Sequence, residues 1–200
     1  MSARLFKDDV VFMQRLLKSS GVYQGRIDGT WAAKTEAAVR RFETQSHLLK
    51  ESLGSFDLRS ESHIAGLLLQ AQAAARAFMR KLEDAGIAAR IISGTRSYAE
   101  QNALFRRGRW GNPGPRVTNA RGGGSSHNFA IAWDIGIFDR GSYIRAVGPY
   151  EKAAELVADD KLEWGGNWLG FKDRPHFQMA TGLSIREVRE RFEAGKPFLL

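Results

Sequence analysis

The sequence predicts an α+β protein in which a small N-terminal helical bundle precedes a larger domain with an antiparallel sheet. Two observations lead to this fold class. Segments with helical and with strand periodicity are mixed along the chain at hairpin-like spacing. At 200 residues, of which 43% are hydrophobic, the chain is long enough for one ordinary domain with a real core plus a small second one.

The N-terminal unit is expected to be a helix–loop–helix. Apolar residues at helical spacing predict a helix over 8–18, which Gly21 ends. A loop rich in turn residues, YQGRIDGTW, then leads to a second helix over 34–46. Thr30 or Thr35 is available to cap this second helix at its N-terminus.

The rest of the chain supplies the larger domain, which we place at 56–200, after a helical domain at 1–50. In chain order, the segments expected here are an irregular connection over 47–60, a long helix over 61–86, a strand over 87–94, a turn and helix within 95–108, a Gly/Pro-rich loop over 111–126, a strand over 131–138, a helix over 149–159, a short strand near 175–180 and a closing helix over 184–194.

Composition excludes several classes of protein. The chain has no cysteine, which rules out a disulfide scaffold, a thiol nucleophile and a zinc site built on thiolates. Lys and Arg outnumber Asp and Glu by 30 to 22, which gives a net charge of +8. A basic protein tends to meet polyanions. The charges are scattered and of mixed sign, however, and no motif combines aromatic with basic residues, so we expect no nucleic-acid partner.

The N-terminal stretch does not have the pattern of a targeting segment. Lys7, Asp8 and Asp9 interrupt it, and it has neither an apolar core nor a cleavage site, so no signal peptide is expected. No stretch approaches the ~18 apolar residues that a membrane span needs. We therefore expect synthesis in the cytoplasm and no insertion into a membrane.

The strand expected over 131–138 carries an acid that needs an explanation. Alternate residues of a strand share a face, so in AIAWDIGIF one face is wholly apolar and Asp134 lies on the other, between Ala132 and Gly136. A carboxylate in that position is costly to bury unless it meets a cation or hydrogen-bond donors. A metal ion is one answer, and a buried arginine or backbone N–H groups are the other.

Two histidines favour the metal. His127 lies seven residues before Asp134, at the end of a Gly-rich loop. Pro175 suits the start of a strand, on which His176 and Gln178 share one face. Imidazole and carboxylate are ordinary zinc ligands, and three protein ligands leave one position for water, which is the pattern of a catalytic site.

The remaining polar residues near this pattern divide into one candidate base and two surface histidines. Asp173 precedes His176 by three residues, and a carboxylate beside a metal-bound water can serve as general base. His47 and His63 fall in the expected connection and at a polar helix start, so we interpret both as surface residues.

The N-terminal unit carries a series of matching residues over almost its whole length, namely Val11, Gln14, Leu17, Gly21, Tyr23, Gly25, Asp28, Gly29, Thr35, Ala38, Val39 and Phe42. With these residues the unit resembles a peptidoglycan-binding domain found beside many wall hydrolases. The chain departs from that pattern at Trp31–Ala32, where a Gly-containing pair is usual, and at Glu43, where Gln is common.

In the second domain, the residues from Ser125 to Asp134 form the segment SSHNFAIAWD. This segment is similar to a signature of the VanY-type D-Ala-D-Ala carboxypeptidase family of zinc metallopeptidases, with Ala130 where the family has Gly. The later segment EWGGNWLGFKDRPHFQ is similar to the L-alanyl-D-glutamate endopeptidase branch, which includes phage endolysins, with Asn167 in place of a commoner Asp. The resemblance runs from about Phe56 to the C-terminus and implies a hedgehog/DD-peptidase-like catalytic domain.

The resemblance implies a role for each residue that matches. His127, Asp134 and His176 are the expected ligands of Zn²⁺, and Asp173 is the expected catalytic acid and base. Arg96, in SGTRS, matches an arginine that stabilises the developing oxyanion or holds the substrate; its other interpretation is a surface arginine that follows a strand.

Three further residues keep two interpretations each. Ser125 either contacts the substrate or shapes its turn, and Trp164 and Trp168 either line the cleft or pack in the core.

The resemblance implies a zinc metallopeptidase that uses an activated water to cut the L-Ala–D-Glu bond of peptidoglycan stem peptides. We expect a monomer that acts in the periplasm or cell wall. It would be either a phage endolysin, synthesised in the host cell, or an antibacterial effector. One alternative is a D-Ala-D-Ala carboxypeptidase. Another is a non-catalytic wall-binding zinc protein, which Asp173 disfavours because a structural site needs no base.

Overall fold

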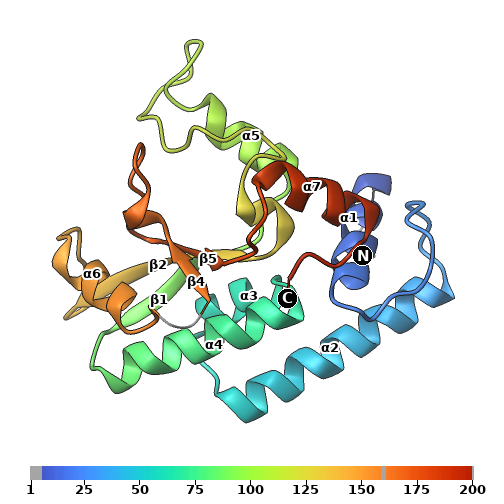
Figure 1. Cartoon of the computed structure of the whole chain (residues 1–200), viewed down its shortest axis with the longest axis horizontal. Helices are drawn as coiled ribbons and strands as arrows, with labels where there is room; N and C mark the ends of the chain where they lie inside the picture. Colours follow the sequence, from blue (N-terminus) through green and yellow to red (C-terminus); the bar gives the residue numbers. More distant parts are fainter. Residues whose placement is uncertain (1–5, 159–160, 200) are drawn as a thin grey trace.

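The computed structural model describes residues 6–158 and 161–199. It confirms the α+β class: helices form the N-terminal part, and an antiparallel sheet lies in the C-terminal part (Figure 1). The elements in chain order are α1 (Lys7–Ser19), α2 (Ala33–Leu53), α3 (Leu58–Ala65), α4 (Leu69–Asp84), β1 (Ala89–Ser93), α5 (Tyr98–Arg106), the 3-10 turn η1 (Ser126–Phe129), β2 (Ala132–Asp139), β3 (Ser142–Tyr143), α6 (Gly148–Glu155), β4 (Leu162–Trp164), η2 (Gly165–Asn167), β5 (His176–Met179) and α7 (Ile185–Ala194).

The sheet has the strand order β1-β2-β5-β4, with β3 paired to β2, and every pairing is antiparallel. The long strand β2 is central and shares ladders with β1 on one side and β5 on the other. The expected alternation along β2 is confirmed. Trp133 and Ile135 are fully buried and Asp134 is half-buried on the opposite face.

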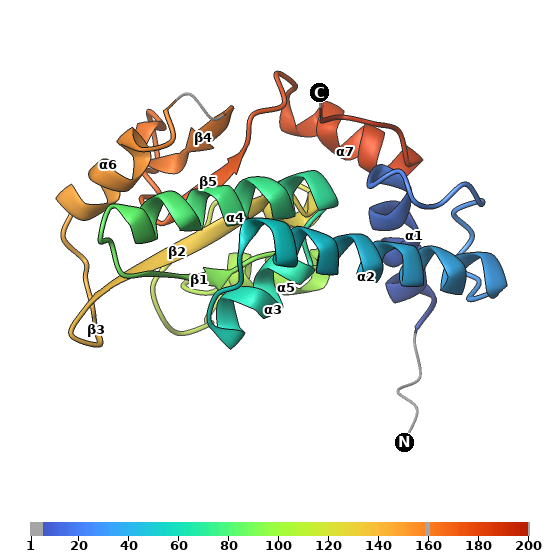
Figure 2. The same ribbon diagram turned by 90° about the horizontal axis from the view of Figure 1, so that it is seen from below.

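Helix α4 covers the apolar face of the sheet, as Figure 2 shows. Phe78 of α4 lies with its ring centroid 6.1 Å from that of Trp133 and 4.5 Å from that of Phe177, and all three side chains are fully buried. Burial of apolar surface is the dominant favourable term in folding, and large aromatic side chains contribute much of it here. One face of the sheet is therefore committed to the core, which leaves the other free to carry polar groups.

The N-terminal helix–loop–helix is present, and one buried glutamine holds its loop in place. Gln14 of α1 accepts hydrogen bonds from the backbone N–H groups of Asp28 (3.0 Å) and Gly29 (2.9 Å), and its amide donates to the carbonyl of Thr30 (3.1 Å). Gly29 adopts a φ of 72°, which side chains disfavour. The cap of the second helix was predicted wrongly, because Ala32 occupies the N-cap and no side chain caps it.

The prediction of an irregular connection over 47–60 is wrong. Helix α2 continues to Leu53 and ends at Gly54, which has a φ of 97°. The segment SHLLKESL is polar but made mostly of good helix formers, so its polarity indicated an exposed helix face rather than a loop. Half-buried Leu49 packs against the core from this extension.

The single helix expected over 61–86 is also wrong, because the chain turns between α3 and α4. The Leu68 N–H donates to the carbonyl of Ala130 (2.9 Å) instead of continuing a helix, and the Thr95 hydroxyl donates to the carbonyl of Gly66 (2.6 Å). Leu67 and Leu68 are buried in the core at this turn. Tertiary contacts therefore outweigh the helical propensity of the segment. The short strands β3 and β4 were not predicted, and the last residue of the expected helix 149–159 lies outside the described residues.

The N-terminal helices pack directly against the larger domain. Figures 1 and 2 both show α1 beside α7 and α2 beside α4. The rings of Phe12 and Phe192 lie 5.8 Å apart, and the Ser46 hydroxyl of α2 donates to Gln72 of α4 (2.7 Å). Among the described residues, no helix is long and apolar enough to cross a membrane.

Gln14→Ala tests whether the buried glutamine supports the N-terminal unit. We expect the free energy of unfolding to fall by about 2 kcal/mol or more, because the loop amides lose their acceptor inside the protein. Urea denaturation followed by circular dichroism measures the change. Gln24→Ala, at an exposed position of the loop, is the control and should change stability by less than about 0.5 kcal/mol. Equal stability of both variants would contradict this account.

Candidate metal centre

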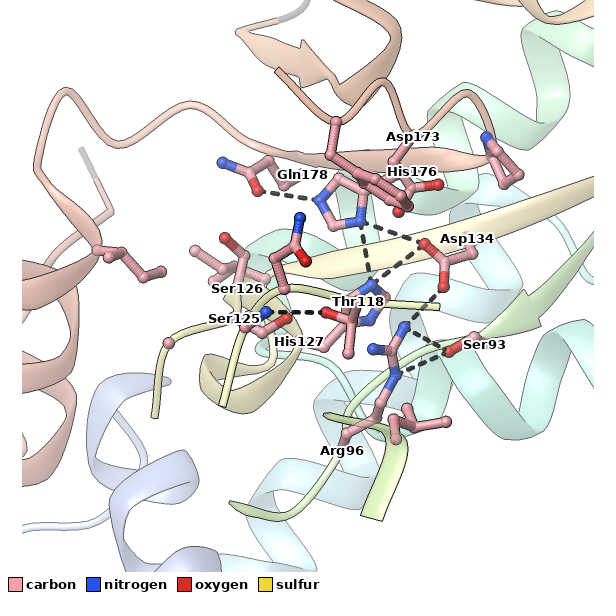
Figure 3. Close-up of a pocket in the computed structure, with 18 of the residues that line it drawn as sticks. Ser93, Arg96, Thr118, Ser125, Ser126, His127, Asp134, Asp173, His176 and Gln178 are labelled. Atoms are coloured by element: carbon pink, nitrogen blue, oxygen red, sulfur yellow. Dashed lines mark hydrogen bonds and ion pairs between the residues drawn. The ribbon is translucent and has the colours of Figure 1, made fainter. Parts of the chain in front are cut away.

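Three elements far apart in the sequence bring His127, Asp134 and His176 together on the polar side of the sheet. His127 comes from η1, Asp134 from β2 and His176 from β5. The β2–β5 ladder places Asp134 directly opposite His176, and side chains at paired positions of neighbouring strands share a face. Figure 3 shows the three side chains pointing toward one another.

The inward atoms of these residues form a nearly equilateral triangle. His127 Nε2 lies 3.1 Å from Asp134 Oδ1 and 3.1 Å from His176 Nδ1, and His176 Nδ1 lies 3.2 Å from Asp134 Oδ1. Ligand atoms ~2.0–2.1 Å from a tetrahedral zinc ion lie ~3.3 Å from one another. The three residues therefore have the spacing of three ligands on one face of such an ion.

The outer partners of the two histidines decide which ring nitrogen carries the proton. His127 Nδ1 lies 2.6 Å from the carbonyl of Gly94, and His176 Nε2 lies 3.0 Å from Gln178 Oε1. Both partners are acceptors, so the outer nitrogen must donate. In the neutral imidazoles the inner nitrogens then carry no proton and present lone pairs. Together with Asp134 Oδ1 they make three acceptors that point toward one another. Such a donor set fits a cation.

Arg96 lies behind this cluster. Its guanidinium donates to Asp134 Oδ2 (2.7 Å), and the hydroxyl of Ser93 and the amide oxygen of Gln101 hold it there. The backbone N–H of Arg96 also donates a hydrogen bond to the backbone carbonyl of His127 (3.0 Å). Arg96 is thus not a free surface arginine; it fixes the outer oxygen of Asp134, so that the inner oxygen faces the histidines. Its contact with substrate stays a prediction.

The charges of the cluster shift its pKa values. Burial alone would raise the pKa of Asp134, but the two histidines outweigh it and hold that pKa well below its usual value. Burial lowers the pKa of His127. Burial acts in the same direction on His176, but the hydrogen bond and charge of Asp134 raise its pKa overall. Asp134 is therefore a permanent anion at neutral pH.

Asp173 stands beside the cluster on the turn that precedes β5, and Figure 3 shows it next to His176. Its half-buried side chain lines the same cleft, and burial, assisted by the charge of Asp134, raises its pKa. Gly165 allows this turn to come close, because a Cβ on it would lie 2.5 Å from the Asp173 carbonyl oxygen. The first glycine of the WGG motif therefore permits the position of Asp173.

The cleft around these residues has a volume of about 900 Å³. Ser125 lines it, and Trp168 lies at its rim, with its ring 4.9 Å from that of His176. Trp164 instead packs on Phe177 at 6.4 Å, so of the two tryptophans only Trp168 faces the cleft.

The other two histidines lie outside the triangle. His47 is exposed on α2, as expected of a surface residue. His63 of α3 is half-buried, and burial lowers its pKa, so it is only partly a surface residue.

Sequence reasoning missed the groups that orient the ligands. Gln178 was placed on the face of His176 but given no role, and Glu163, which binds Gln178, lies on the unpredicted strand β4. Ser93 was also missed; it lies opposite Asp134 in the β1–β2 ladder after an irregularity in register. The alternation of β5 was the available signal for Gln178, whereas the other two depend on strand pairing.

Comparison with protein families gives two matches in separate parts of the chain. Residues 118–179 match a family described as D-alanyl-D-alanine carboxypeptidase, and residues 7–50 match one described as a putative peptidoglycan-binding domain. The first match contains His127, Asp134 and His176, whereas Arg96 lies outside it.

Two relatives agree with these matches. The chain is 36% identical over 104 residues to the peptidoglycan L-alanyl-D-glutamate endopeptidase CwlK of Bacillus subtilis; the alignment covers 47% of this chain and 62% of the relative. A crystal structure of the Serratia marcescens L-Ala D-Glu endopeptidase ChiX superposes with a TM-score of 0.50 and 26% identity, over 62% of this chain and 88% of that one. The chain is therefore similar to D-alanyl-D-alanine carboxypeptidases over residues 118–179, to a putative peptidoglycan-binding domain over residues 7–50, and to L-alanyl-D-glutamate endopeptidases over 47% to 62% of its length; it spans less than two thirds of the length of CwlK.

Proposed function

We propose that this protein is a zinc-dependent peptidoglycan hydrolase that cuts the L-Ala–D-Glu bond of wall stem peptides. The observation that carries the proposal is the convergence of three ligand atoms, all within 4.8 Å of one another, at the wall of a cleft that also holds Asp173. Both relatives described above are named as endopeptidases for this bond.

His127, Asp134 and His176 would hold the zinc ion. When bound, zinc supplies a Lewis acid and a water whose pKa falls to about 7. Arg96 keeps Asp134 oriented through its 2.7 Å contact. The other two ligands are oriented by their own acceptors, so the triangle is set before any ion arrives.

Asp173 is the proposed acid and base. Its raised pKa means that the carboxylate accepts a proton more readily than an ordinary aspartate, which suits a group that must take a proton from water and return it to the leaving amine. Its half-buried place on the cleft wall lets it face both water and substrate. We assign Ser125 to the substrate-binding wall of the same cleft.

The two matched segments suggest a division of labour, with residues 1–50 holding the wall and 56–200 cutting it. We propose a monomer, because the residues that form the site all come from one chain. A D-Ala-D-Ala carboxypeptidase is the second candidate, because the matched family carries that description.

Digestion of purified muropeptides separates the two activities. With pentapeptide stems, we expect mass spectra to show the sugar still carrying L-alanine and a released peptide that begins at D-Glu and keeps both of its C-terminal D-alanines. A chelator should abolish cleavage, and added zinc should restore it. Loss of a single C-terminal alanine would favour the carboxypeptidase instead, and cleavage that survives full removal of metal would contradict the zinc site.

His176→Ala should remove zinc from the protein, because a site of two ligands binds far more weakly than one of three. Metal analysis after gel filtration measures the zinc bound per chain. His47→Ala, an exposed histidine on α2, is the matched control and should keep its zinc. A His176→Ala protein with full zinc content would contradict the ligand assignment.

Asp173→Asn should keep zinc but lower kcat by roughly 10²–10⁴-fold, the usual contribution of a positioned base. The wild-type activity should also fall on acidification at a pH above the usual pKa of aspartate, because burial raises the pKa of Asp173 and only its ionised form accepts a proton. Near-normal kcat in Asp173→Asn with zinc bound would rule out its role as the base.

A further inference from the structure

The three candidate ligands are held from behind by different kinds of group. His127 is held by a backbone carbonyl, that of Gly94, and Asp134 by the Arg96 guanidinium. Of the three, only His176 is held by a side-chain amide, that of Gln178. An amide side chain has a donor end and an acceptor end, so its orientation needs a cause.

Glu163 supplies that cause from the neighbouring strand. The β4–β5 ladder places Glu163 directly opposite Gln178, and Gln178 shares the face of His176 two residues along β5. The Gln178 amide nitrogen donates to Glu163 Oε2 (2.8 Å), while its Oε1 accepts from His176 Nε2 (3.0 Å). Three residues thus form a single line of hydrogen bonds along the wall of the cleft, whose lining includes all three of them.

We propose that Glu163 and Gln178 are positioning residues that set the tautomer of His176 and thereby the metal affinity of the site. This inference rests on the metal site of the proposed function. A carboxylate can only accept hydrogen bonds, so Glu163 draws the amide nitrogen of Gln178 toward itself and turns Oε1 toward His176. The proton of a neutral His176 is then held on Nε2, and Nδ1 keeps its lone pair toward Asp134 and His127.

The opposite orientation would disable the ligand. An amide rotated by 180° presents its NH₂ group to His176, which could accept that hydrogen bond only through an unprotonated Nε2. The proton of a neutral ring would then sit on Nδ1, where it blocks the metal. Glu163 also polarises the amide, and the stronger acceptor raises the basicity of the Nδ1 lone pair.

The two residues should differ in the size of their effect. Gln178 touches His176 and is half-buried, whereas Glu163 is exposed, so water screens its charge. Gln178→Met keeps the volume of the side chain but removes the acceptor, and should weaken zinc affinity about 10- to 100-fold. Glu163→Ala should weaken it less, by about 3- to 10-fold.

Zinc affinity measured by competition with a chromophoric chelator tests the proposal without any need for turnover. The decisive variant is Glu163→Ala combined with Gln178→Met. Because Glu163 acts only through Gln178, the double variant should bind zinc as tightly as Gln178→Met alone. The matched control is Glu155→Ala, which removes the same charge from an exposed position on α6 and should leave affinity unchanged.

A second readout reports the tautomer directly. Nitrogen NMR of the metal-free protein at a pH where His176 is neutral should show its proton on Nε2 in the wild type and a mixture of tautomers in Glu163→Ala. This measurement also keeps the test decisive if Gln178→Met fails to fold, since Glu163 is exposed at the surface.

Three results would overturn the inference: wild-type affinity in Gln178→Met, losses in the double variant that multiply those of the single ones, or an unchanged tautomer in Glu163→Ala. A wild-type protein that binds no zinc would overturn the positioning role of Glu163 and Gln178 together with the metal site. If zinc binds with the expected losses in the variants but stem peptides are not cleaved, the positioning role stands and only the proposed hydrolase activity is refuted.

Discussion

The pairing of β2 with β5 is the constraint on which the core and the candidate site both depend. In one register it sets Trp133 opposite Phe177 on the apolar face and Asp134 opposite His176 on the polar face. A slip of one residue in a strand moves every side chain to the other face. Such a slip would expose the aromatic pair that packs on α4 and bury Asp134 among apolar groups. The packing of the core therefore selects the same strand register that places Asp134 beside His176.

The triangle of acceptors has an energetic cost for the folded protein. Two buried imidazole lone pairs and a carboxylate oxygen about 3.1 Å apart repel one another unless a proton or a metal ion lies between them. The hydrogen bond and the charge of Asp134 raise the pKa of His176 above its ordinary value, so this ring keeps a proton to a higher pH than a free histidine does. Zinc and a proton then compete for the same position, and metal binding is coupled to both proton release and stability.

Much of the fold and of the candidate site could be predicted from the sequence, where local pattern suffices. The two-residue alternation around Asp134 and the strand start at Pro175 gave correct faces for Asp134 and His176, and the helical spacing over 8–18 gave α1. The errors lie where distant contacts decide. The break near Gly66 depends on hydrogen bonds from Thr95 and to Ala130, far along the chain. The partners of the ligands depend on strand register, which a linear sequence does not display.

The packed contact between α1 and α7 determines how the two domains can work together. A wall-binding module on a flexible linker would let the cleft sweep a volume set by linker length. Here α1 packs against α7, with the rings of Phe12 and Phe192 5.8 Å apart, so the N-terminal helices are held against the larger domain. If the N-terminal unit binds the wall as proposed, each binding event would place the cleft at one distance from the bound site, and cleavage elsewhere would require release and rebinding.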